Sequence, residues 1–209
     1  FQSIAPPATV CGANQFGDDM PAMQARMAAN LITHPTDPAR YVMWIDAGLN
    51  PSVTGGHDVH NASVEINGGN LPHTFEALLD QIVDPNNPRP GDDRRIDLDE
   101  TMIVINTEFG RTPYAQGTTG TNHFPQAYVN VFIGGPVQGP TVYGHATEAE
   151  GFAQTFVRPA ENRMMLLQSM GIYPFSSQSY NVADVQVTGG DGELEAAERI
   201  RDLYLGVTV

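Results

Sequence analysis

Apolar residues recur at helical spacing in four stretches of the chain. In residues 16–32, Asp18 or Asp19 is placed to cap a helix, and Pro21 follows in its first turn. We expect the apolar residues that are spaced three or four positions apart in this helix to face the core: Met20, Met23, Met27 and Leu31. The same periodicity predicts further helices at residues 71–83, 159–172 and 191–207.

Short apolar runs mark the predicted strands, which lie at residues 40–46, 101–107, 128–135 and 140–144. These runs do not alternate strictly between apolar and polar residues, which is typical of strands covered on both faces. Because strands and helices alternate along the chain, the pattern predicts the α/β class, with a mostly parallel sheet sandwiched by helices. Residues 1–209 are interpreted as a single α/β domain or the C-terminal part of one.

Polar stretches follow three of the predicted strand ends or lie near them. "GGHDVHN" comes after the first strand, "EFGRTP" directly after the second, and "TNHFP" in the loop before the third. Ligands of open α/β sheets bind beyond the carboxyl ends of the strands. The stretches hold two carboxylates and two imidazoles, a donor mixture typical of zinc, manganese or iron sites. The sequence therefore predicts a metal site formed by Asp58, His60, Glu108 and His123.

Each of these residues also has a simpler explanation. Asp58 can cap a turn in its glycine-rich loop, and His123 can bond a backbone carbonyl group. Glu108 and Arg111 can pair with each other where the strand ends. What favours the metal site is that all four candidate ligands fall at one predicted edge of the sheet.

Composition excludes some classes of function. The formal net charge is −14, which opposes nonspecific attraction to nucleic acid or anionic lipid. No apolar run approaches the roughly 18–20 residues that a membrane span needs. The single cysteine, Cys11, cannot form a disulfide within the chain and is interpreted as a free structural thiol. The chain begins at Phe1, which fits removal of an upstream segment or a partial chain.

The order of these motifs resembles a bacterial family called domain of unknown function 1501, which is similar to the alkaline-phosphatase and sulfatase superfamily. The resemblance covers roughly residues 16–173, and "EFGR" with its flanking strand is its most specific part. Residues 174–209 are a C-terminal extension with a helix. The resemblance implies a doubly wound α/β sandwich with metal at the strand ends, and a periplasmic or extracellular location.

The resemblance also implies roles for the candidate residues. Asp58, His60 and His123 fall where the superfamily holds one metal ion, and Glu108 falls where an acidic ligand holds a second. Arg111 falls where it would face the substrate anion and act in catalysis. The implied cofactor is a divalent metal, zinc first, with manganese, iron or calcium as alternatives.

The sequence departs from the superfamily pattern at three places. Phe109 stands where superfamily phosphatases carry a histidine ligand, and Asn122 stands where the family usually shows aspartate. Nothing in residues 1–40 resembles the first strand, which brings a nucleophile in this superfamily. Cys11 has no neighbouring base or ligand that would support that role. We therefore expect either an incomplete half of the full fold, completed by an N-terminal half or a partner chain, or a family member that has lost the front of its site.

Two classes of function follow. The first is a metal-dependent hydrolase of phosphate or sulfate esters, with a small anionic ester as substrate and this chain supplying the C-terminal part of the metal site. The second is a non-catalytic surface, assembly or binding module on a degenerate hydrolase fold. The first predicts bound metal, and the second predicts none or a closed structural site.

Overall fold

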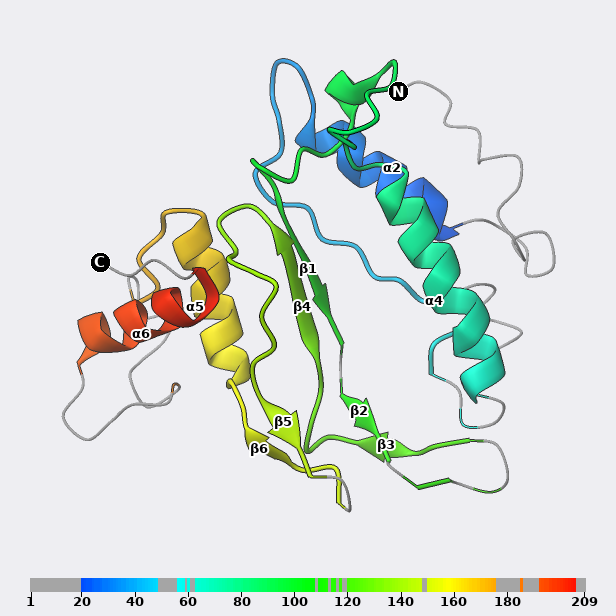
Figure 1. The fold of residues 1–209 in the computed structure, drawn as a ribbon, viewed down its shortest axis with the longest axis vertical. Coiled ribbons are helices and arrows are strands. Elements are labelled where there is room, and N and C mark those ends of the chain that lie inside the picture. The colour runs from blue at the N-terminus through cyan, green and yellow to red at the C-terminus, as the bar shows by residue number, and fades with distance from the viewer. Residues whose placement is uncertain are drawn as a thin grey trace. The chain divides into compact units, whose positions relative to one another are not determined.

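The computed structural model describes residues 20–48, 56–58, 60, 63–107, 109–112, 114–115, 117, 120–147, 150–175, 185 and 192–205. The chain divides into two compact units, whose elements are labelled in Figure 1. The first unit consists of Phe1–Leu98 and Arg111–His123. The second consists of Asp99–Gly110 and Phe124–Val209. No helix within the described ranges is both long enough and apolar enough to span a bilayer.

Two helices that pack against each other form the centre of the first unit: α2 (Met20–Ile32) and α4 (Ser63–Leu79) (Figure 1). The buried face of α2 is made of small side chains, namely Pro21, Ala22, Ala25, Ala28 and Ala29. On α4, Asn70, His73 and Ala77 are buried at spacings of three and four residues. Alanine lets two helix backbones approach closely, so this face of α2 suits a tight helix pair.

The helix predicted in residues 16–32 is present, but its predicted core face is wrong. Met20, Met23, Met27 and Leu31 are all exposed, with relative accessibilities from 40% to 52%. Both faces of α2 are apolar, one with methionine and one with alanine, so helical periodicity alone does not tell which of them meets α4. The result is an apolar stripe on the surface of the first unit.

The strand predicted at residues 40–46 pairs with no other strand in the part of the chain that is described. Accessibility nevertheless alternates along it. Tyr41, Met43 and Ile45 are exposed, whereas Val42, Trp44 and Asp46 are half-buried. The segment thus has the two-residue period of a strand but not the hydrogen-bonded pairing of one. Its last residue, Asp46, belongs to the half-buried face.

The second unit contains antiparallel strand pairs, so the prediction of a mostly parallel, alkaline-phosphatase-like sheet sandwiched by helices is wrong. β1 (Met102–Asn106) pairs antiparallel with β4 (Asn130–Gly134). A parallel neighbour requires a crossover of a dozen or more residues, usually a helix, and no helix lies between β1 and β4 in the described residues. The chain between them instead forms β2 (Gly110–Arg111) and β3 (His123–Phe124), which pair with each other.

A third two-stranded sheet replaces the strand predicted at residues 140–144, which does not form. β5 (His145–Ala146) pairs antiparallel with β6 (Ala153–Thr155). All three sheets found among the described residues have two strands each. A single-turn 3-10 helix, η1 (Asp92–Arg94), lies in the first unit.

Helices α5 (Pro159–Ser169) and α6 (Glu193–Leu205) bury the core of the second unit (Figure 1). Pro159 occupies the first turn of α5, and Gly171, with φ of 74°, follows its end. The buried core consists of Met164, Met165, Phe175, Val185, Ala196, Ala197, Ile200 and Leu205. Glu161 is fully buried in α5, and its Oε1 accepts a hydrogen bond of 2.7 Å from Nη2 of Arg199 in α6.

Candidate metal centre

A short hairpin places two of the candidate side chains on the same face. The backbone N–H of Thr112 donates to the carbonyl oxygen of Asn122 at 3.0 Å, and the N–H of Asn122 donates to Oγ1 of Thr112 at 3.1 Å. The neighbours of this pair, Arg111 and His123, therefore stand opposite each other across the hairpin. Their side chains meet a third residue, Asp58, which comes from the loop before α4.

One oxygen of Asp58 is the centre of the cluster. Oδ1 accepts a hydrogen bond of 2.7 Å from Nη2 of Arg111 and lies 3.0 Å from Nε2 of His123. Nε2 of His60 is 3.6 Å from the same oxygen. The His60 and His123 rings are 4.8 Å apart between centroids and tilted by 45°. Asp58, His60 and His123 each offer one ligand atom, and these atoms all lie within 4.8 Å of one another.

This donor set fits a divalent metal ion. Donor atoms that surround a tetrahedral zinc ion at 2.0–2.2 Å lie roughly 3.3–3.6 Å from one another. The distances of 3.0 and 3.6 Å from Asp58 to the two imidazoles are close to that value, whereas the separations within the set extend to 4.8 Å, so a bound ion would draw the donors closer together. All three side chains are partly exposed, at 58% for Asp58, 38% for His60 and 43% for His123. Three such side chains with solvent access would leave a coordination position open if they held an ion, as in catalytic zinc sites.

Hydrogen bonds keep the Asp58 carboxylate in the ionised form that a metal ligand requires. The hydrogen bond with His123, followed by that from Arg111, lowers the pKa of Asp58 below its usual value of 3.8. The carboxylate is therefore ionised at neutral pH. Nη2 of Arg111 also lies 3.5 Å from the backbone oxygen of His57, so the guanidinium group spans two neighbouring residues of the loop.

The structure thus brings together four of the five site residues predicted from the sequence. Asp58, His60 and His123 form one cluster, and Arg111 lies beside them. The fifth residue, Glu108, lies outside the described residues, as does Cys11. Nε2 of His123 lies 3.0 Å from Oδ1 of Asp58, and Nη2 of Arg111 donates to the same oxygen at 2.7 Å.

Sequence reasoning missed two residues that hold the loop in front of Asp58. Asp46 is the last residue of the predicted strand at 40–46, and His57 directly precedes Asp58. Nε2 of His57 lies 3.0 Å from Oδ2 of Asp46. The available signal was an aspartate directly after an apolar run and a histidine in the same loop as two candidate ligands. Only the fold shows that the two meet.

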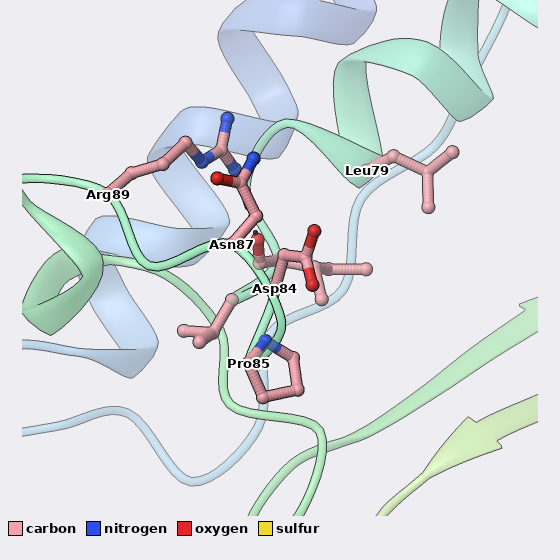
Figure 2. A pocket seen from close by; sticks show the side chains of 7 residues that line it. Leu79, Asp84, Pro85, Asn87 and Arg89 are labelled. Carbon is pink, nitrogen blue, oxygen red and sulfur yellow. Dashed lines mark hydrogen bonds between the residues drawn. The ribbon is translucent and has the colours of Figure 1, made fainter.

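The pocket drawn in Figure 2 is separate from this cluster. It has a volume of about 400 Å³ and is formed at the turn after α4 by Leu79, Ile82, Val83, Asp84, Pro85, Asn87 and Arg89. Its one cationic side chain, Arg89, pairs with Asp80 at 3.3 Å. None of the three candidate ligands lines it, so the pocket adds nothing to the metal centre.

Comparison with known proteins supports the family resemblance over part of the chain. Residues 93–176 match the family described as "Protein of unknown function (DUF1501)". The match includes Arg111 and His123 and begins after Asp58 and His60, and it covers less than half of the chain. No curated protein and no solved structure matches the chain.

Proposed function

We propose that Asp58, His60 and His123 form the divalent-metal centre of a hydrolase that acts on phosphate or sulfate esters. The observation that carries this proposal is their convergence: ligand atoms from two distant segments lie within 4.8 Å of one another. An arginine beside a cluster of metal ligands suits an anionic substrate, because its planar donors match the oxygens of a phosphoryl or sulfuryl group.

Each side chain has a separate role in the proposal. The two imidazoles and the Asp58 carboxylate bind the ion, and zinc is the first choice for such a nitrogen and oxygen donor set. The bound ion would supply Lewis-acid chemistry at the ester oxygen. Arg111 binds the substrate anion and stabilises the charge that develops in the transition state. Glu108 is proposed as an acidic ligand of a second ion.

The choice of ester substrates rests on the motifs "EFGRTP" and "NHFP" and on their resemblance to the alkaline-phosphatase and sulfatase superfamily. The observed sheets do not support that relationship, because they are small and antiparallel. We propose that the nucleophile and the remaining ligands come from an N-terminal half or a partner chain. A periplasmic or extracellular location is a further part of this proposal.

A second candidate function, that of a non-catalytic binding module, is favoured by the surface of α2. Its exposed apolar stripe, formed by Met20, Met23, Met27 and Leu31, is typical of surfaces that bind a partner. In that case the charges around Asp58 would form an ion-pair cluster that needs no metal. Metal content together with metal-dependent ester hydrolysis therefore decides between the two functions, because a binding module could also hold a closed structural ion.

The test is a zinc titration of chelator-treated protein with elemental analysis of the product. We expect the unsubstituted chain to bind zinc, and we expect Asp58→Asn and His123→Ala to lose it while they keep the far-UV circular dichroism of the fold. Glu108→Gln keeps size and removes charge, so it should lower the number of ions bound. His145→Ala is the matched control, because His145 also begins a two-residue strand and is exposed.

Ester hydrolysis is tested with the nitrophenyl esters of phosphate and sulfate, and zinc, manganese, iron and calcium are added separately. We expect metal-dependent release of nitrophenol when the chain is supplied with its N-terminal half or partner. Zinc retained in both Asp58→Asn and His123→Ala would eliminate this site. A chain that binds none of the four metals would favour the binding module.

A further inference from the structure

The carboxylate of Asp46 joins three segments of the first unit. Oδ1 accepts a hydrogen bond of 2.8 Å from the backbone N–H of Gly48. Oδ2 accepts one of 2.6 Å from Oγ1 of Thr74 and lies 3.0 Å from Nε2 of His57. Asp46 therefore ties its own loop to helix α4 and to the residue that directly precedes Asp58.

Helix α4 presents three polar side chains to this region, at spacings of three and four residues: Asn67, Asn70 and Thr74. Oδ1 of Asn67 lies 3.1 Å from Nδ1 of His57, so both ring nitrogens of His57 have a partner. Nδ2 of Asn70, which is 2% exposed, donates to the carbonyl oxygen of Gly56 at 2.9 Å. The backbone and the side chain just before Asp58 are thus both anchored to α4.

Close packing leaves this anchor little freedom to shift. Gly48 has φ of 80°, and a Cβ atom built there would lie 2.8 Å from Nδ2 of Asn70 and 3.0 Å from the backbone of Gly56. The loop after Asp46 is therefore held directly against the loop before Asp58. A side chain at position 48 would push the two loops apart and would also be strained in this conformation.

His57 connects the contacts of Asp46 to the proposed metal centre. Its carbonyl oxygen lies 3.5 Å from Nη2 of Arg111, the same nitrogen that donates to Asp58 at 2.7 Å. We propose that Asp46 is a positioning residue of the metal centre, which acts through His57 to hold Asp58 in reach of His60 and His123. This inference rests on the proposed metal site, and it assigns Asp46 no contact with metal or substrate.

The physical reason is preorganisation. The Asp58 side chain is exposed and is held by only a few contacts of its own, so its position depends on the peptide that precedes it. Outer residues that orient metal ligands typically change metal affinity about 10- to 100-fold when they are removed. A purely structural role for Asp46 would instead change the stability of the fold and leave the affinity for zinc unchanged.

The experiment compares zinc affinity and thermal stability in variants of the full chain. Asp46→Ala removes all three contacts, and we expect zinc affinity to fall about 10- to 100-fold. Asp46→Asn can accept from Gly48 and donate to a neutral His57 ring, so we expect it to keep most of the affinity. Thr74→Val removes one contact at constant shape and should have an intermediate effect. Thr36→Val, an exposed threonine of the same unit, is the control.

Each outcome decides the proposal. Unchanged zinc affinity in a folded Asp46→Ala protein would overturn it, whatever happens to the melting temperature. Equal losses in Asp46→Ala and Asp46→Asn would overturn the positioning role, because the charge of Asp46 would then act rather than the bonds that asparagine retains. If Asp46→Ala does not fold, Thr74→Val decides, and unchanged affinity there overturns the proposal. An unsubstituted chain that binds no zinc would reject the metal site itself.

Discussion

Glu161 gives the sharpest test of how the second unit is held together. Its side chain is fully buried between α5 and α6. Oε2 accepts a hydrogen bond of 2.7 Å from the backbone N–H of Arg158, at the start of α5, and Oε1 accepts one of 2.7 Å from Arg199. Replacement of Glu161 by alanine removes the helix cap and the link between the two helices in one step.

The expected cost follows from those two bonds. Hydrogen bonds to charged groups each contribute about 1.5–3 kcal/mol, and the loss of a helix cap alone costs about 0.5–2 kcal/mol. The Arg199 side chain is 36% exposed, so it regains water when its partner is removed and the cost of leaving it unpaired is reduced. We therefore expect Glu161→Ala to lower the free energy of unfolding by about 2–4 kcal/mol.

Urea unfolding followed by far-UV circular dichroism measures this change. With an m-value of about 2 kcal/mol per molar urea, the midpoint should fall by roughly 1–2 M. Glu198→Ala is the matched control, because Glu198 lies on α6 and is exposed. If Glu161→Ala unfolds at the same urea concentration as Glu198→Ala, the buried link between α5 and α6 does not stabilise the unit.

Two further predictions concern the first unit. On the proposed function, Arg111→Met should leave zinc bound, because Arg111 is no ligand. It should lower ester hydrolysis about 100- to 1,000-fold, measured as kcat with nitrophenyl phosphate when the N-terminal half or partner is supplied. In metal-free protein, burial opposes ionisation of Asp46, but the hydrogen bonds with His57 and Thr74 outweigh this effect and lower the Asp46 pKa below 3.8. The same contact with Asp46 raises the His57 pKa above 6.5. The stability from this pair should be full between pH 3.8 and 6.5 and fall on either side, as urea unfolding would show.

The signs of the pH prediction follow from the two groups. A lowered carboxylate pKa stabilises the fold above its unfolded value, and that contribution is lost as acid protonates Asp46. A raised imidazole pKa stabilises the fold below its unfolded value, and that contribution is lost as His57 gives up its proton. Asp46→Asn should reduce the loss of stability both below pH 3.8 and above pH 6.5. An unchanged profile in that variant, or loss of zinc by Arg111→Met, would contradict these assignments.

Local patterns in the sequence predicted several elements correctly. The apolar runs at residues 101–107 and 128–135 contain β1 and β4, and three periodic stretches contain α2, α5 and α6. The stretch predicted at residues 71–83 overlaps only the later part of α4, which begins at Ser63 and ends at Leu79. Gly171 marks the end of α5 because a left-handed residue is needed there and glycine adopts it without strain. These features depend on neighbours along the chain, which the sequence displays directly.

Two features that depend on distant partners were not predicted. The direction of β1 against β4 is set by which segment returns beside it, and an apolar run looks alike in parallel and antiparallel pairs. Arg199 stands four residues after Glu195, a spacing typical of a helical ion pair, yet it bonds Glu161 in α5. A buried carboxylate is a stronger attraction for the guanidinium group than a solvated one, and sequence spacing does not reveal burial.

The structure brings three predicted ligands together although the parallel sheet that was expected to carry them is absent from the described residues. Asp58, His60 and His123 were selected by chemical type and by their positions in polar stretches. Neither property depends on whether the sheet is parallel or antiparallel. The Asp46–His57 contact was missed because Asp46 reads as the polar end of a strand. Its partners on α4 become visible only when the helix is placed beside the loop.

The cluster around Asp58 also bears on the order in which the chain folds. Asp58 is separated from Arg111 by 53 positions and from His123 by 65. Contacts at such separations form slowly, because closing a long loop loses chain entropy before any contact compensates for it. Helices such as α2 form from neighbouring residues within about a microsecond. We therefore expect the Asp58 contacts to form late in refolding. If the proposed metal site is correct, time-resolved zinc uptake would report the moment at which the two distant segments meet.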